Sequence, residues 1–158
     1  MSTEAAYKPR WLELIAAVRS RFSGEVGYNA GGLIGPFPTS QEYRNVTFTG
    51  ALDFLGISAY PRLSAKRDAD ADDYRKGWTQ NAYGNNSLKQ LNDFLEATDK
   101  DVYLTELGSP ATRGGAFFLN RPRAASATYD LDQQAAFFDA SLEVPATATE
   151  GRLEGIYI

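Results

Sequence analysis

The chain has 158 residues and a formal net charge of −4, which gives no electrostatic basis for binding nucleic acid or an anionic membrane. It contains neither cysteine nor histidine, so disulfides, thiolate metal sites and catalytic triads built on those residues are excluded. No apolar run approaches the roughly 20 residues that span a bilayer. Carboxylates, tyrosines, arginines and lysines remain for catalysis.

Helices and short apolar strands alternate along the chain. Apolar residues recur at helical spacing after Pro9, which suits the first turn of a helix, and Ser23-Gly24 ends that helix. A charged stretch over 66–76 is interpreted as a solvated loop or helix face. The predicted elements are, in order, a helix over 9–22, a strand over 26–30, a loop over 31–49, a strand over 52–60, a helix around 88–95, a strand over 102–106, a loop over 108–128, a helix from 131 that ends before Pro145, and a strand over 153–158.

Four strands that alternate with helices along the chain predict parallel pairing with right-handed crossovers, in the α/β class. The strands are apolar on both faces, which predicts that both faces are covered. The longer loops follow the strands, so function is expected at the carboxyl ends of the strands. A complete (β/α)₈ barrel usually needs about 250 residues. Two architectures therefore stay open: a four-stranded doubly wound domain, or a piece of a barrel.

The segment around Glu106 carries the strongest functional signal. An apolar run from Val102 to Leu104 is followed by Thr105, Glu106 and then turn residues. This pattern is typical of a buried parallel strand that delivers an acidic side chain to its carboxyl end, where α/β enzymes place their chemistry. A carboxylate that caps a loop or pairs with an arginine would give the same pattern, so the residues alone leave both interpretations open.

Three segments of the chain form a recognisable series. They are 11–30, with the pattern Trp11-x-x-Leu14-Ile15-x-x-Val18-Arg19, then Leu52-Asp53-Phe54-Leu55-Gly56-Ile57-Ser58-Ala59-Tyr60, then Val102-Tyr103-Leu104-Thr105-Glu106-Leu107-Gly108. Together they resemble the second half of clan A glycoside hydrolases, with glycoside hydrolase family 113, the β-mannanase family, as the suggested match. The resemblance implies a parallel (β/α) half-barrel, strands five to eight of a TIM barrel, with residues 1–158 as a single partial domain truncated at both ends.

The resemblance implies a retaining hydrolase that cleaves a β-1,4-linked polysaccharide or oligosaccharide, such as β-mannan. Such enzymes use two carboxyl groups about 5–5.5 Å apart. Glu106 matches the position of the nucleophile, and Tyr60 matches that of a tyrosine that hydrogen-bonds it. The acid/base glutamate is expected upstream of Met1, so the chain alone is predicted to be inactive. No cofactor or metal is required.

Three further residues are candidates for substrate binding. Asn29 ends a predicted strand and could bond a sugar hydroxyl, or form a turn before the glycines that follow. Trp78 could stack on a sugar ring, or pack a helix against the sheet. Arg62 lies in a loop on the same side as Tyr60 and Glu106 and could contact substrate, or simply be solvated.

Other functions are kept as alternatives. A catalytically inactive carbohydrate-binding or scaffolding half-barrel would need a partner to close its sheet, either an N-terminal half-barrel or a second copy, because open sheet edges favour pairing. A flavodoxin-like binding domain is less favoured, since the glycines at 31–35 lack a dinucleotide fingerprint. The acidic run over 68–73 lacks the glycine and glutamate of a calcium loop and is interpreted as a solvated face. The sequence leaves the glycan, endo or exo action and cellular location open.

Overall fold

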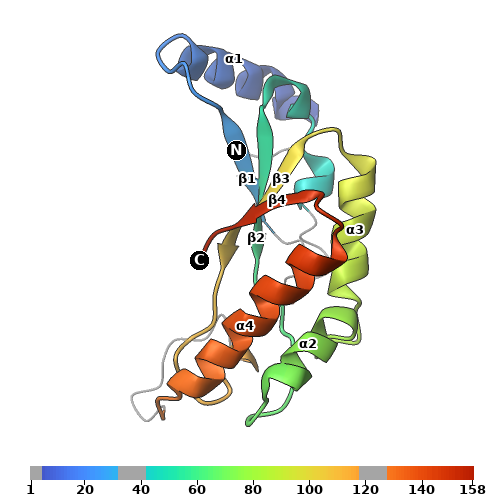
Figure 1. The fold of residues 1–158 in the computed structure, drawn as a ribbon. Coiled ribbons are helices and arrows are strands. Elements are labelled where there is room, and N and C mark those ends of the chain that lie inside the picture. The colour runs from blue at the N-terminus through green and yellow to red at the C-terminus, as the bar shows by residue number, and fades with distance from the viewer. Residues whose placement is uncertain (1–4, 32–41, 118–127) are drawn as a thin grey trace.

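The computed structural model describes residues 5–31, 42–117 and 128–158. In these residues one parallel sheet has the strand order β1-β2-β3-β4, so each strand pairs with the next along the chain. This confirms the predicted α/β class and the parallel pairing (Figure 1). The strands are β1 Gly27–Ala30, β2 Phe54–Ala59, β3 Asp101–Leu107 and β4 Leu153–Ile156.

Two α-helices lie between β2 and β3 and one between β3 and β4, whereas 3₁₀ turns are the helical elements described between β1 and β2. Short 3₁₀ turns occupy parts of the two predicted loops, at Glu42–Asn45, Thr49–Ala51 and Gly115–Phe117. Residues 32–41 and 118–127 of those loops, with most of the glycine-rich stretch at 31–35, lie outside the described residues. The α-helices are α1 Lys8–Arg19, α2 Ala71–Thr79, α3 Ser87–Ala97 and α4 Leu131–Ala148.

The acidic run over 68–73 forms the start of α2. Asp70 is the N-cap: its side chain accepts a hydrogen bond from the Asp73 backbone N–H at 2.9 Å, and the Asp70 backbone N–H is directed back to the Asp73 carboxylate at 3.4 Å. This capping box satisfies backbone donors that the first turn leaves unpaired. Lys66 Nζ also bonds Asp73 at 2.6 Å, and the pKa of Asp73 is lowered, first by this bond.

The prediction that the helix after residue 131 ends before Pro145 is wrong. α4 continues through Pro145 to Ala148. Proline lacks the N–H of the helical ladder and crowds the preceding turn, which usually ends a helix. Here Pro145 is buried, and its carbonyl oxygen accepts bonds from both the backbone N–H and the hydroxyl of Thr149, at 3.2 and 2.8 Å. Tertiary packing of the last turn therefore outweighs local propensity.

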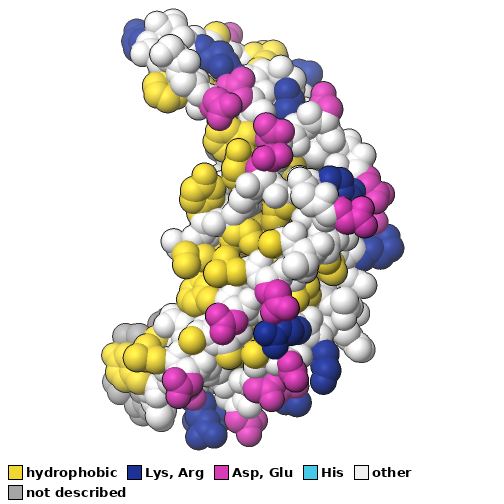
Figure 2. All heavy atoms as spheres, in the orientation of Figure 1, with side chains coloured by type: hydrophobic (Ala, Val, Ile, Leu, Met, Phe, Trp, Pro, Cys, Tyr) yellow, Lys and Arg dark blue, Asp and Glu magenta, His cyan; other side chains and the backbone are white. Residues whose placement is uncertain are grey.

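The sheet is covered on one face. Leu55, Ile57, Val102 and Leu104 point to the side of the helices and are at most 2% exposed. The intervening side chains on the opposite face, Tyr103 among them, are only partly buried. The expectation that both faces are covered is thus not met in the described residues, and a doubly wound domain is not supported. Figure 2 shows hydrophobic side chains gathered along the hollowed side of a crescent-shaped molecule.

α1 is held mainly by one aromatic cluster. The Trp11 ring stacks on Phe48 at 4.7 Å and meets Tyr28 edge-on at 5.2 Å. Ile15 is also buried, at 7% exposure, whereas Leu14 is 47% and Val18 38% exposed. α1 therefore presents apolar side chains that the described residues do not cover.

Asp53 anchors the beginning of the sheet. Its carboxylate accepts bonds from the Val26 backbone N–H and from Arg19 Nη2, both at 2.7 Å, and these bonds lower the pKa of Asp53. The Asp53 backbone N–H returns a bond to the Val26 carbonyl at 2.9 Å. These contacts help set the register in which Asn29 of β1 lies opposite Gly56 of β2.

None of the helices in the described residues combines the length and the apolar character that crossing a bilayer requires.

Candidate functional site

A β-bulge in β3 shapes the carboxyl end of the sheet. Leu104 pairs with Ile57, but the next pair is Glu106 with Ser58, so Thr105 has no counterpart in β2. Successive side chains of a regular strand point to opposite faces. An extra residue interrupts that alternation. Thr105 and Glu106, although adjacent in sequence, can therefore both reach the open face of the sheet.

Glu106 receives hydrogen bonds from a residue of β1 and from the residue that follows β2. Asn29 at the end of β1 donates from Nδ2 to Glu106 Oε1 at 3.0 Å, and Tyr60, directly after β2, donates its hydroxyl to Oε2 at 3.1 Å. The structure thus brings together Glu106, Tyr60 and Asn29, three of the residues singled out from the sequence. Each carboxylate oxygen has one donor, and the side chain stays exposed, so the Glu106 carboxylate is held in place and remains accessible from solvent.

Asn29 is the centre of a wider hydrogen-bond network. Its Oδ1 accepts from Thr105 Oγ1 at 2.8 Å and from Ser58 Oγ at 3.2 Å. Its Nδ2 donates to Ser58 Oγ at 3.0 Å in addition to Glu106. The amide of Asn29 is therefore engaged within the protein on both its oxygen and its nitrogen, and a bond to a sugar hydroxyl stays a prediction.

The pKa of Tyr60 is raised above its usual 10.0 by burial, by its hydrogen bond to Glu106 and by the charge of that residue. Since the negative charge opposes formation of tyrosinate, we expect Glu106→Gln to lower the pKa of Tyr60 while burial keeps it above 10.0. Titration of tyrosine ¹³Cζ resonances by NMR, with Tyr60→Phe to assign the signal, measures the change.

Tyr103 provides the matched control for this titration. Its pKa is raised by burial and by Glu154, Asp101 and other charges, with Glu106 not among them, so Glu106→Gln should leave it unchanged. An unaltered Tyr60 signal, or an equal shift of both tyrosines, would contradict the contact between Tyr60 and Glu106.

Trp78 does not face a sugar site, which corrects the stacking interpretation. Its side chain is fully buried, with 0% exposure, in α2. No face of the ring is open to a ligand in this structure. The burial of Trp78, on a helix whose Tyr74 and Gly77 are also buried, favours the other interpretation considered from the sequence, packing within the fold.

Arg62 lies against Tyr83, a residue that the sequence did not single out. Arg62 Nη1 donates to the Tyr83 hydroxyl at 2.8 Å, and the guanidinium carbon lies 5.0 Å from the ring centroid. The Ala82 backbone N–H also bonds the Arg62 carbonyl at 2.8 Å. Arg62 is thus fixed to the loop between α2 and α3, two residues after Tyr60, and its contact with substrate stays a prediction.

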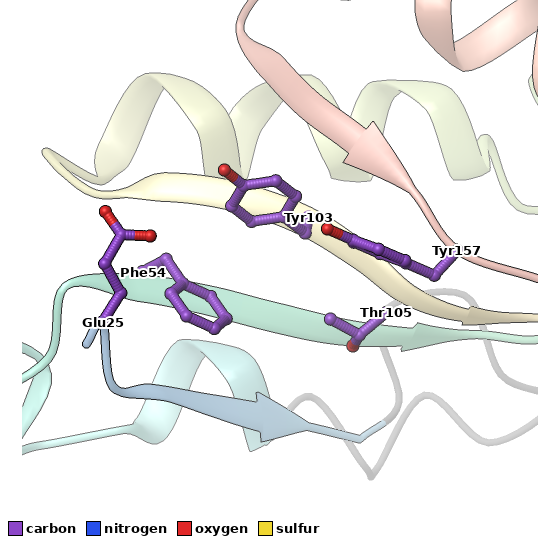
Figure 3. Close-up of a pocket in the computed structure, with 5 residues that line it drawn as sticks. All are labelled: Glu25, Phe54, Tyr103, Thr105 and Tyr157. Carbon is purple, nitrogen blue, oxygen red and sulfur yellow. The ribbon is translucent and has the colours of Figure 1, made fainter. Parts of the chain in front are cut away.

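The open face of the sheet contains a hollow of about 280 Å³. Figure 3 shows Glu25, Phe54 and Tyr103 towards the start of the strands, with Thr105 and Tyr157 further along. Glu106 is not among the lining residues, so the hollow lies beside the carboxylate rather than around it. Rings directed into this space would suit a covering layer of protein or a bound ligand.

The Asp and Glu side chains of residues 5–31, 42–117 and 128–158 form no group of three or more that could hold a metal ion.

Comparisons with known proteins agree with this geometry. The family model of Glycoside Hydrolase Family 113 matches residues 1–157. Two solved structures, described as "Complex structure of GH113 beta-1,4-mannanase" and "Structure of GH113 beta-1,4-mannanase", each have a TM-score of 0.66, with 23% and 24% identity. The matches cover 94% and 96% of this chain but only 39% and 40% of those chains. No curated protein matches.

At this level of identity the two structures establish the fold: the chain spans about two fifths of each, consistent with a barrel half. The family match extends over almost the entire chain. The chain therefore belongs to glycoside hydrolase family 113.

Proposed function

We propose that this chain is the nucleophile-bearing part of a retaining glycoside hydrolase that cleaves a β-1,4-linked polysaccharide such as β-mannan. The observation that carries the proposal is the Glu106 carboxylate, exposed at the carboxyl end of β3 and held by Tyr60 and Asn29. Carboxyl ends of barrel strands are where catalytic residues of this architecture lie. Family membership supports the reaction class, and the β-1,4-mannanase structures support the substrate.

In the proposed mechanism Glu106 attacks the anomeric carbon of the sugar. The glycosidic bond breaks as a second carboxylic acid protonates the leaving oxygen, which leaves a glycosyl ester on Glu106. Water activated by the second carboxylate then displaces Glu106, so the product keeps the original anomeric configuration. Tyr60 and Asn29 hold the two Glu106 oxygens in position for attack, and Arg62 with Tyr83 is proposed to contact the sugar chain.

The second carboxylate is proposed to come from the remaining part of the barrel. The chain spans about two fifths of the mannanase structures, and the open face with Phe54, Tyr103 and Tyr157 is the surface that the remaining strands would cover. An N-terminal half-barrel is therefore the preferred partner. An inactive carbohydrate-binding half-barrel, or a pair of identical chains, is the alternative, and the ring-lined hollow would then be its ligand or partner surface.

Activity assays of the chain alone and of a chimera test this proposal. The 158-residue chain alone should show no measurable β-mannan hydrolysis. It is proposed to lack the second carboxyl group, and general acid catalysis by such a group is worth roughly 10² to 10⁴-fold in rate. A chimera in which residues 1–158 replace the matching segment of a family 113 β-1,4-mannanase should hydrolyse β-mannan with retention, followed by NMR of the first-formed anomer.

Three results would count against the proposal. An inverted first product would exclude the retaining mechanism. A folded chimera without activity would favour the carbohydrate-binding alternative. Robust hydrolysis by the chain alone would show that both carboxyl groups lie within it.

A further inference from the structure

We propose that Thr105 is a positioning residue that holds the side-chain amide of Asn29 in place at its oxygen, while its NH₂ group faces Glu106. This inference rests on the proposed function for its catalytic meaning, but the hydrogen bonds that carry it exist independently of turnover. Thr105 Oγ1 lies 2.8 Å from Asn29 Oδ1, the shortest bond in the network around that amide.

The two orientations of the Asn29 amide differ in what they offer Glu106. With Nδ2 towards Glu106, as in the structure, the carboxylate receives a donor. With the amide rotated by half a turn, its carbonyl oxygen would face the carboxylate, and two acceptors would confront each other. Holding the first orientation is therefore a requirement for a firmly placed carboxylate.

Ser58 alone cannot select that orientation. Its hydroxyl lies 3.0 Å from Asn29 Nδ2 and 3.2 Å from Oδ1, and a hydroxyl can donate or accept. It would satisfy either orientation about equally. The Glu106 carboxylate only accepts, so it favours the orientation with Nδ2 towards it. The Thr105 hydroxyl then donates to Oδ1 on the other side of the amide, so Thr105 anchors the oxygen while Glu106 holds the nitrogen.

Two features of the backbone place the Thr105 hydroxyl. The bulge leaves Thr105 unpaired with β2 and lets it share the open face with Glu106. Gly56 of β2 supplies the space: a Cβ at that position would lie 2.7 Å from both Thr105 Oγ1 and Cγ2. Real contacts of a Cβ are not that short, so any larger residue at Gly56 would displace the threonine.

Amide NMR on the ¹⁵N-labelled 158-residue chain tests the proposal. In the wild type, the Asn29 Nδ2 proton bonded to Glu106 should exchange slowly with solvent. Thr105→Val keeps the shape but removes the hydroxyl, and should speed this exchange by roughly tenfold, the effect of losing one hydrogen bond. Thr105→Ser should restore the wild-type signal. Gly56→Ala should reproduce the effect of Thr105→Val, and backbone spectra report folding.

Each outcome decides the matter. Unchanged Asn29 exchange in Thr105→Val overturns the proposal, as does an equal effect of Thr105→Ser, because packing of the methyl group would then be responsible. If Thr105→Val does not fold, a measurement on the Thr105 hydroxyl proton of the wild-type chain still tests the proposal. A Thr105 hydroxyl proton protected from exchange, with a nuclear Overhauser contact to Asn29, supports the proposal, and a rapidly exchanging proton overturns it. None of these readouts requires Glu106 to be catalytic, so the proposed function can fail separately.

Discussion

Replacing Glu106 by glutamine in the mannanase chimera should reduce kcat/KM for β-mannan by roughly 10³-fold or more, because a carboxamide cannot form the glycosyl ester. The substitution keeps the size of the side chain: Asn29 can still donate to its oxygen, and the Tyr60 hydroxyl can accept from its NH₂ group. The loss is therefore expected in the chemical step, with little change in KM. Rates at saturating and limiting polysaccharide measure both parameters. Glu143→Gln is the control, since Glu143 is an exposed residue of α4 paired with Arg75, and it should retain activity.

An external nucleophile separates the role of attacker from that of acid/base. In Glu106→Ala, the space left by the side chain should admit azide, which attacks an activated aryl β-mannoside from the face that Glu106 occupied. Displacement by azide in a single step gives the α-mannosyl azide, of inverted configuration. NMR of the product identifies the anomer. A β-mannosyl azide would instead assign Glu106 the acid/base role, and undiminished hydrolysis by Glu106→Gln would remove it from the mechanism.

Trp78→Ala should lower the free energy of unfolding of the chain by about 3–5 kcal/mol, the range for truncating a fully buried large aromatic residue. Trp78 is 0% exposed, and the adjacent Gly77 fits so closely that an added Cβ would overlap the backbone carbonyl of Leu63. The close fit at Gly77 places α2 against the segment that follows β2 and carries Tyr60 and Arg62. Urea unfolding followed by far-ultraviolet circular dichroism measures the change without relying on tryptophan fluorescence.

Two further variants sharpen this test. Leu14→Ala removes an apolar side chain that is 47% exposed on α1, and should change stability by no more than about 0.5 kcal/mol. Trp78→Phe should cost less than Trp78→Ala, because it keeps a ring and removes a buried indole N–H that has no hydrogen-bond partner among the described residues. Full stability in Trp78→Ala, together with weaker binding of oligosaccharide, would restore the sugar-stacking interpretation.

Local sequence patterns predicted some residues of the site and missed others. Glu106 could be singled out because it closes an apolar strand, and parallel strands end at one edge of a sheet. Tyr60 was singled out by the resemblance to clan A glycoside hydrolases. Thr105 and Ser58 were missed as partners of Asn29, because regular alternation places Thr105 and Glu106 on opposite faces. The bulge depends on how β3 pairs with β2, and the sequence of β3 alone does not predict it. Trp78 was ambiguous for a related reason, since an aromatic residue near a loop has the same local pattern whether buried or exposed.

The sequence by itself determined the α/β class, the order of the four strands, and the delivery of a carboxylate and a tyrosine to strand ends, because hydrophobic periodicity and turn residues act over short distances along the chain. Only the tertiary structure decided that one face of the sheet is left open, that α4 runs through Pro145, and that Asn29 turns its amide towards Glu106. Those outcomes depend on which surfaces meet across the sheet, and contacts between residues as far apart as Asn29 and Glu106 are not encoded in any local stretch.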